Sequence, residues 1–323
     1  MKTTKNFLCG ISAVLALTLP LASAGQEFPS RAVTIIVPHV AGAGTDLIAR
    51  VIINKLADKW KQPIVVDNRA GASGVIGSRQ MVASPPDGYT LLIQGATHVT
   101  NQFTQKDLPY DTLKSFTPLG LIATSPYVLA ASSQSGVTSL QQVLENIRND
   151  PDRRSVGVGD NSTRLIGAVI AERAKVEFQM IPYKGGAPML ADLMGGHIPF
   201  GISSVSSTYA ANKSGKIGIV AVLNSERSQA LKMIPTANEQ GLPGSFPTYW
   251  FGLFGPAGMD RALADGISKD FAEVLALPEI RNQFIDIGID PVGSTPDQFD
   301  VRIKADLKLW SELITQTGIR LDQ

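Results

Sequence analysis

The sequence predicts an α/β protein of two lobes, each a mainly parallel sheet flanked by helices. Short apolar runs alternate with helical patterns through most of the chain, which is typical of parallel strands connected by helices. The 323 residues are more than one hydrophobic core usually serves, so we expect two lobes. After Phe254 the pattern is helical only, and such a tail needs an existing sheet to pack on.

The elements fall into two series and a tail. In the first series we predict strands at 32–37, 64–66 and 89–93, and helices at 46–60 and 75–83. In the second series we predict strands at 155–158, 178–182, 198–202 and 217–223, and helices at 139–149, 165–174, 188–194 and 206–212. In the tail, Thr295 to Gln298 combines an N-cap, a proline at the first helical position and a capping box, so it opens a last helix that ends at Gly318.

The lobes follow from this order. Lobe 1 is predicted to combine residues 25–124 with 250–323, and lobe 2 to contain residues 125–249. We expect the chain to cross between them near 122–128 and to return near 249–255.

Residues 1–24 have the layout of a secretory signal peptide. Lys2 and Lys5 precede an apolar run from Phe7 to Leu21, and Ala22 to Ala24 supplies small residues for a signal peptidase. The run is shorter than the ~20 residues that cross a bilayer. We therefore expect cleavage after Ala24 and export of the remaining chain, with a retained N-terminal anchor as the alternative.

The composition excludes several function classes. The only cysteine, Cys9, lies in the signal, so we predict no disulfide, thiolate metal site or cysteine nucleophile. Without Lys2 and Lys5, 27 basic residues stand against 28 acidic ones, which argues against nucleic acid and anionic membrane surfaces as partners. The three histidines are far apart and have no metal-ligand spacing, so we predict no metal site.

We find no sequence signature of an enzyme. Neither a G-x-S-x-G nucleophile elbow nor a P-loop occurs. Gly42 to Leu47 begins like the dinucleotide fingerprint, but Leu47 replaces the third glycine, which close packing of helix on strand requires. We predict no cofactor and no catalytic residue, although a triad assembled from distant residues stays open as an alternative.

The glycine-bearing loops suit the capture of a small anion. Gly42 to Asp46 joins a predicted strand to a helix, whose N-terminus offers N–H groups and partial positive charge. Gly157 to Thr163 repeats this arrangement in the second series. Because ligands of open α/β sheets bind at the carboxyl ends of strands, loops 94–97, 183–186 and 203–207 belong to the same edge. The alternative is that the glycines have a structural role only, which is to permit tight turns.

Several stretches, taken together, resemble one family of exported receptors. Ile36 to Asp46, Val66 to Gly74, Pro86 to Leu92, Pro182 to Gly185 and Trp250 to Leu253 follow one another as in the Bug-type receptors. These are the extracytoplasmic solute-binding proteins of the tripartite tricarboxylate transporter group. The resemblance extends from about Phe28 to Ile319.

The resemblance implies a type II-like periplasmic binding protein fold with two crossovers between the lobes. It also implies a periplasmic location, a monomer, permease subunits as partners, and a small carboxylate ligand such as an organic acid, dicarboxylate or acidic amino acid. The candidate ligand-binding residues lie on the loops described above: His39, Val40, Ala41, Gly44, Thr45, Asp46, Gln94, Ala96 and Thr97 in lobe 1, and Gly159, Asn161, Ser162, Thr163, Tyr183, Gly185 and Ser203 in lobe 2.

The chain departs from the family pattern at a few positions, and we expect these to tune specificity. His39 and Val40 stand where the family often has an aromatic residue or proline, and Ala43 replaces a glycine. Asp160 and Arg164 differ from the small residues that are common in the second-lobe loop. A periplasmic ligand sensor that acts on a signalling partner, or a periplasmic enzyme, is the alternative function.

Overall fold

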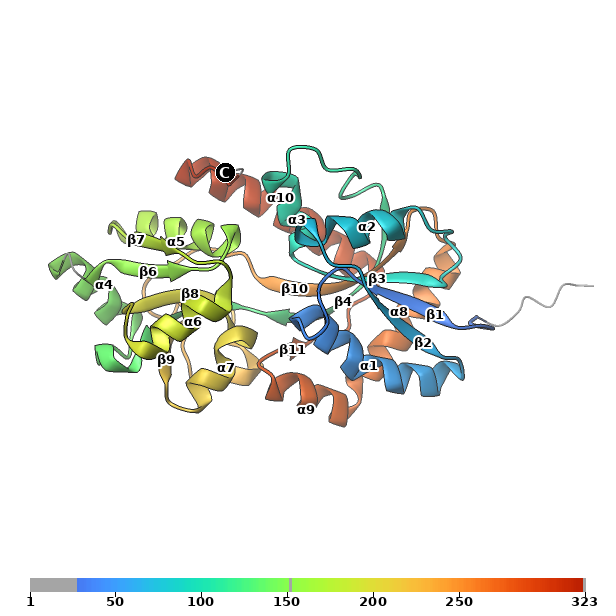
Figure 1. Ribbon diagram of the computed structural model, residues 1–323, viewed down its shortest axis with the longest axis horizontal. Helices are drawn as coiled ribbons and strands as arrows, with labels where there is room; N and C mark the ends of the chain where they lie inside the picture. The colour runs from blue at the N-terminus through green and yellow to red at the C-terminus, as the bar shows by residue number, and fades with distance from the viewer. Residues whose placement is uncertain (1–27, 151–152, 322–323) are drawn as a thin grey trace, which may run out of the picture.

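The computed structural model describes residues 28–150 and 153–321, which form two lobes side by side (Figure 1). The predicted signal peptide and Cys9 lie outside these residues. Within the described ranges, none of the helices combines the length and the apolar character that crossing a bilayer requires.

The first lobe is built on a six-stranded sheet with the order β11-β4-β10-β3-β1-β2. Its strands are β1 (Val33–Val37), β2 (Ile64–Asn68), β3 (Thr90–Gly95), β4 (Phe116–Ser125), β10 (Tyr249–Pro256) and β11 (Asp290–Pro291). Its helices are α1 (Gly44–Trp60), α2 (Val75–Val82), α3 (Thr97–Thr104), α8 (Arg261–Ala276), α9 (Pro278–Asp286) and α10 (Pro296–Thr317).

The second lobe is built on a five-stranded sheet with the order β7-β6-β8-β5-β9. Its strands are β5 (Tyr127–Ser132), β6 (Ser155–Val158), β7 (Gln179–Pro182), β8 (Phe200–Ser204) and β9 (Ile217–Leu223). Its helices are α4 (Leu140–Asn149), α5 (Asn161–Ala174), α6 (Gly186–Gly195) and α7 (Val205–Lys213). The two-lobed α/β class is therefore confirmed.

Most strands of each sheet run in one direction, as predicted, but both sheets are mixed, because β10 and β11 in lobe 1 and β5 in lobe 2 run the other way. In lobe 1, β10 lies antiparallel to β3 and β4, and in lobe 2, β5 lies antiparallel to β8 and β9. Each of these strands enters its sheet from the other lobe, so it runs opposite to its neighbours. One reversed strand inside a sheet replaces two parallel pairings with antiparallel ones.

The sequence analysis missed five elements, α3, β4, β5, β10 and β11, and placed most others within a few residues. It assigned no element to the crossings, where β4, β5 and β10 lie, and it expected no strand in the tail, where β11 pairs with β4. The last helix has the predicted ends. Thr295 and Gln298 form a reciprocal capping box, Pro296 stands at the first helical position, and Gly318 closes the helix in the left-handed conformation with φ 64°.

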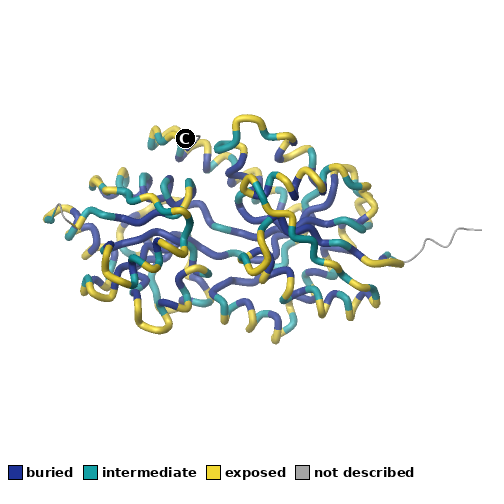
Figure 2. The backbone as a smooth tube through the Cα atoms, viewed as in Figure 1, coloured by how far each residue is buried: buried dark blue, intermediate teal, exposed yellow. Residues whose placement is uncertain are grey.

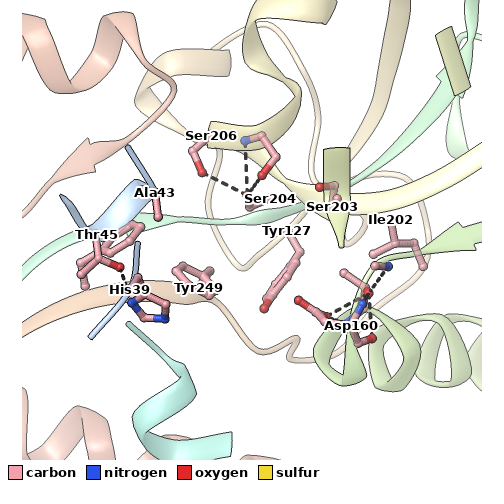
Figure 3. Close-up of a pocket in the computed structure, with 16 residues that line it drawn as sticks. His39, Ala43, Thr45, Tyr127, Asp160, Ile202, Ser203, Ser204, Ser206 and Tyr249 are labelled. Carbon is pink, nitrogen blue, oxygen red and sulfur yellow. Dashed lines mark hydrogen bonds between the residues drawn. The ribbon is translucent and has the colours of Figure 1, made fainter. Parts of the chain in front are cut away.

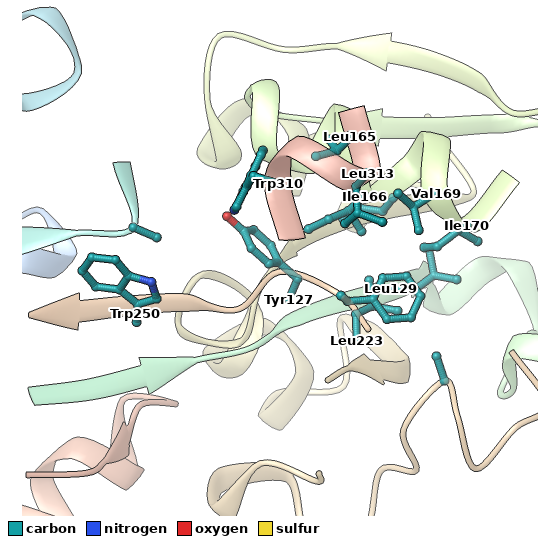
Figure 4. Close-up of a cluster of buried hydrophobic side chains, with 14 of the residues drawn as sticks. Tyr127, Leu129, Leu165, Ile166, Val169, Ile170, Leu223, Trp250, Trp310 and Leu313 are labelled. Carbon is teal, nitrogen blue, oxygen red and sulfur yellow. The ribbon is translucent and has the colours of Figure 1, made fainter. Parts of the chain in front are cut away.

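The apolar core continues from one lobe into the other. One cluster joins Ile36 and Leu92 of lobe 1, through Trp250 and Trp310, to the core of lobe 2 around Leu129 (Figure 4). The buried strands form the centre of both lobes, with exposed residues at the surface (Figure 2). We keep 25–124 with 250–323 and 125–249 as our assignment of the lobes, and each sheet then lies within one lobe apart from single residues at the crossings.

Candidate functional site

A cavity of about 230 Å³ lies between the lobes, where the loops after β1, β6, β7 and β8 meet (Figure 3). None of its lining residues is Lys or Arg. They are His39, Ala43, Gly44, Thr45, Tyr127, Gly159, Asp160, Thr163, Gly186, Ile202, Ser203, Ser204, Ser206, Ser207, Tyr249 and Phe251.

On the side of lobe 1, the cavity meets the N-terminus of α1. Ala43 is the N-cap residue, and since no side chain caps this helix, its first N–H groups are without a side-chain partner. The Thr45 hydroxyl lies 3.2 Å from Nδ1 of His39. Burial lowers the pKa of His39 below 6.5, so its imidazole is neutral at pH 7. This wall offers neutral hydrogen-bonding groups at the positive end of a helix.

Asp46 stabilises the conformation of the loop between β1 and α1 without lining the cavity. Its carboxylate accepts hydrogen bonds from the Gly42 N–H (2.8 Å), Arg50 Nε (2.8 Å) and Asn68 Nδ2 (3.0 Å), and the residue is only 1% exposed. Burial by itself would raise the pKa of Asp46, but the hydrogen bonds from Arg50, Gly42 and Asn68 hold it below its usual value. Its charge is therefore balanced within lobe 1.

On the side of lobe 2, the side chains of Asp160 and Thr163 cap the N-terminus of α5. Asp160 Oδ1 accepts from the Thr163 N–H at 2.8 Å, and Thr163 Oγ1 accepts from the N–H groups of Gly159 and Asp160, both at 3.0 Å. This capping box uses the donors that the glycine-bearing pattern predicted for a ligand.

Gly159 brings the loops after β6 and β7 together. A Cβ added to Gly159 would lie 2.9 Å from both the Gly185 carbonyl carbon and the Gly186 nitrogen, which are backbone atoms. Gly185, with φ 107°, precedes α6, and no side chain caps that helix. The N-terminus of α6 at Gly186 is thus the second uncapped helix end at the cavity.

The hydroxyl groups of Ser204, the last residue of β8, and Ser125, the last residue of β4, cap the N-terminus of α7. Ser204 Oγ accepts from the Ser207 N–H at 3.3 Å, and Ser125 Oγ accepts from the Ser206 N–H at 3.0 Å. The hydroxyl groups of this serine cluster therefore provide the polar surface at that wall, instead of the helix end itself (Figure 3).

Two tyrosines stand at the crossings between the lobes. Tyr127 begins β5 and Tyr249 begins β10, with ring centroids 6.2 Å apart and the rings edge to face. Burial, and then the nearby charge of Asp160, raise the pKa of both phenols above 10, so both are neutral hydroxyls. They add aromatic surface and hydroxyl groups to the middle of the cavity.

Six of the sixteen predicted site residues line the cavity together: His39, Gly44, Thr45, Gly159, Thr163 and Ser203. Gly185 and Ser162 adjoin lining residues, and Val40 and Ala41 are exposed on the same loop as His39. The alignment of both lobes at one edge therefore follows the prediction, although individual contacts with a ligand stay a prediction.

Other predicted residues have partners within the protein. Gln94 is fully buried. Its Nε2 donates to the Ser78 hydroxyl, and its Oε1 accepts from the Gly95 N–H and the Thr97 hydroxyl. Ala96 is the N-cap residue of α3. Asn161 Nδ2 donates to the Leu321 carbonyl at 2.8 Å. The Tyr183 hydroxyl donates to Asp192 at 2.8 Å, and burial and this hydrogen bond raise its pKa to about 12.

The sequence analysis missed Tyr127, Tyr249 and Phe251 because they lie at the crossings and not in the glycine-bearing loops. It noted Asp160 as a departure from the family, and the loop 203–207 as part of the edge, without assigning Asp160 or the later serines to the site. Aromatic residues at a predicted crossing are a signal that could have found the first group, since both lobes meet there.

The arrangement suits hydrogen-bonded capture of a small polar solute. Uncapped helix ends, hydroxyl groups and neutral rings converge from both lobes. Within the described ranges there is no cluster of three or more His, Cys, Asp or Glu residues that could hold a metal ion.

The chain is similar to known proteins in sequence and in fold. Residues 48–319 match the model of the tripartite tricarboxylate transporter family receptor. Protein BugT of Bordetella pertussis is 29% identical over 96% of this chain and 95% of its own. The solved structure of R. palustris Rpa4515 with adipate has a TM-score of 0.80 and 30% identity, and the match covers 91% of this chain and 99% of that one. MatC from Rhodopseudomonas palustris with bound malate has a TM-score of 0.72 and 27% identity, with 89% and 100% covered. The chain therefore belongs to the tripartite tricarboxylate transporter family receptors, and it is a solute-binding protein of the Bug type, not an enzyme.

Proposed function

We propose that this receptor captures a small carboxylate in the cavity between its lobes, in the periplasm, and delivers it to the permease subunits of a tripartite tricarboxylate transporter. The observation that carries the proposal is the convergence of two uncapped helix N-termini, α1 and α6, from opposite lobes on a cavity without Lys or Arg. Helix N-termini bind anions through backbone N–H groups and the helix dipole. The relatives with bound adipate and malate support the ligand class.

The expected binding mode explains how the receptor can do without a cationic side chain. One carboxylate oxygen lies at Gly44 and Thr45 of α1, and a second acceptor group of the solute faces Gly186 of α6. Hydrogen bonds to a charged group contribute about 1.5–3 kcal/mol each. Because the donors belong to both lobes, a ligand favours the arrangement in which the lobes are closed around it.

A panel of organic acids, tested by thermal shift and then by calorimetry, examines the proposal. For an acid that binds, the matched neutral amide should bind at least tenfold more weakly, a difference of about 1.4 kcal/mol. Small-angle scattering should give a smaller radius of gyration for the loaded protein, which should be monomeric in both states. An amide that binds as tightly as its acid would contradict the proposal.

Delivery is tested with the permease subunits in proteoliposomes. Uptake of the labelled acid should require this receptor and should saturate with the receptor concentration. Uptake that proceeds equally without the receptor would contradict a role in delivery, and acid binding without any such uptake would favour a sensor.

A further inference from the structure

Asp160 is an acidic side chain in a cavity proposed to hold an anion. It lines the cavity and is exposed, and His39 is the only other lining residue that could carry a charge near neutral pH. Like charges at short range repel, and few lining groups screen them. A carboxylate ligand that carries no ammonium or hydroxyl group would therefore be disfavoured next to Asp160.

Capping alone does not explain the charge of Asp160. Its Oδ1 accepts from the Thr163 N–H at 2.8 Å and the Thr163 hydroxyl at 3.0 Å. A neutral oxygen suffices for such a cap, as Ser139 shows on α4 and Ser204 on α7. Among residues 28–150 and 153–321, no hydrogen bond or ion pair reaches the second oxygen, Oδ2.

Asp46, the other acid at this edge, has hydrogen-bond partners for its carboxylate within lobe 1. The Asp46 carboxylate is 1% exposed and has Arg50 and Asn68 as partners. Asp160 instead faces the middle of the cavity, beside the hydroxyl of Tyr127 (Figure 3). The phenols of Tyr127 and Tyr249 are neutral and both sense the Asp160 charge, so they leave it uncompensated.

We propose that Asp160 Oδ2 accepts a hydrogen bond from an ammonium or hydroxyl group of the solute, so that this receptor selects amino acids and hydroxy acids over unsubstituted carboxylates. The inference rests on the proposed function, because the carboxylate of the same solute occupies the uncapped helix ends. An ammonium group is favoured most, since a hydrogen bond between two charged groups is roughly twice as strong as one between neutral groups. Asp160 is thus a specificity-determining residue.

Calorimetry with matched acids tests this inference. One set is succinate, malate and aspartate, and a second is glutarate, 2-hydroxyglutarate and glutamate, so that only the donor on the second carbon changes. Wild type should bind the ammonium or hydroxyl member of a set at least tenfold more tightly than the unsubstituted member. In Asp160→Asn this preference should fall below about threefold, with the unsubstituted acid bound equally or more tightly.

Two further variants separate specificity from folding. Asp160→Asn and Asp160→Ser both keep an N-cap oxygen, so the melting temperature of at least one should stay near that of wild type. Asp260→Asn is the matched control, because Asp260 also caps a helix, accepting from the Leu263 N–H at 3.0 Å, but lies away from the cavity. It should leave the ranking of the acids unchanged.

The outcomes distinguish the two proposals. If unsubstituted acids bind wild type as tightly as their substituted partners, or if Asp160→Asn and Asp160→Ser keep the preference, the inference fails while the proposed function stands. If no acid of either set, and no other carboxylate of the panel, binds wild type, the proposed function fails and the inference fails with it.

Discussion

The two glycine-bearing loops at the cavity look alike in sequence but use their helix ends in different ways. The loop before α1 leaves its helix end uncapped and turns its acid, Asp46, away from the cavity into an ion pair. The loop before α5 closes its helix end with Asp160 and Thr163 and leaves one carboxylate oxygen at the cavity. A glycine-bearing loop at a helix start therefore becomes an anion site only if its own side chains leave the N–H groups free.

The largest contrast should appear when each acid is replaced by its amide. Asp46→Asn puts an amide nitrogen among three donors, so we expect it to lower the free energy of unfolding by about 2–3 kcal/mol. Asp160→Asn should cost less than about 0.5 kcal/mol, because asparagine caps a helix as well as aspartate does. Urea unfolding measures both values. Equal losses in the two variants would show that the loops do not differ in this way.

The second contrast concerns the glycine of each loop. In Gly159→Ala the new methyl group meets backbone atoms at 2.9 Å, and we expect a loss of about 1–3 kcal/mol of stability together with weaker ligand binding. In Gly44→Ala the methyl group meets only the Phe251 ring at 3.7 Å, an ordinary contact at the first residue of a helix. Its melting temperature should stay at or above that of wild type. A stable Gly159→Ala would contradict the close approach of α6.

The third contrast separates stability from affinity. Thr163→Val removes the hydroxyl of the capping box and should cost about 1 kcal/mol of stability. Thr45→Val should change stability less and should weaken binding of the acid about tenfold, because its hydroxyl lies at the uncapped helix end. Melting curves and calorimetry on both variants provide the comparison. If the Thr45→Val variant binds the acid as tightly as wild type does, the Thr45 hydroxyl does not contact the ligand.

Much of the fold could be predicted because the local signals are strong. The caps at Thr295 and Gly318 and the apolar run of β1 each specify an element within a few residues. The reversed direction of β10 was not predicted, because the return of the chain from lobe 2 was expected near 249–255 but no strand was assigned there. The short β11 depends only on its pairing with β4.

The site shows the same division between local and tertiary information. Thr45 and Gly159 line the cavity and could be placed there from the sequence, because glycine-rich turns after strands have a known geometry. Gln94 follows the predicted strand as well, but it lies inside β3, and its amide bonds with Ser78 and Thr97, partners that only the folded structure brings near. Likewise, the sequence contains Asp160 and Thr163 three residues apart, a capping spacing that competes with ligand binding for the same N–H groups.

The smallest contrast is in pH dependence, because only the first loop places a histidine at the cavity. Burial lowers the pKa of His39 below its usual value of 6.5, so well above that pH His39 is neutral in both the folded and the unfolded protein. As the pH falls below 6.5, the unfolded chain takes up a proton more readily than the folded one, and the ligand-free protein loses stability. His39→Gln should lose less stability over this range.

A bound carboxylate reverses this effect at the site. Its negative charge next to the imidazole raises the pKa of His39 in the complex, so binding takes up protons and the affinity rises as the pH falls from about 7.5 to about 5.5. The rise stays below tenfold per pH unit, the limit for a single group. Calorimetry in buffers of different ionisation enthalpy gives the number of protons taken up. Because lobe 2 adds no histidine to the cavity, His39→Gln should remove the proton uptake, and uptake that persists in this variant would show that the carboxylate does not lie beside the first loop.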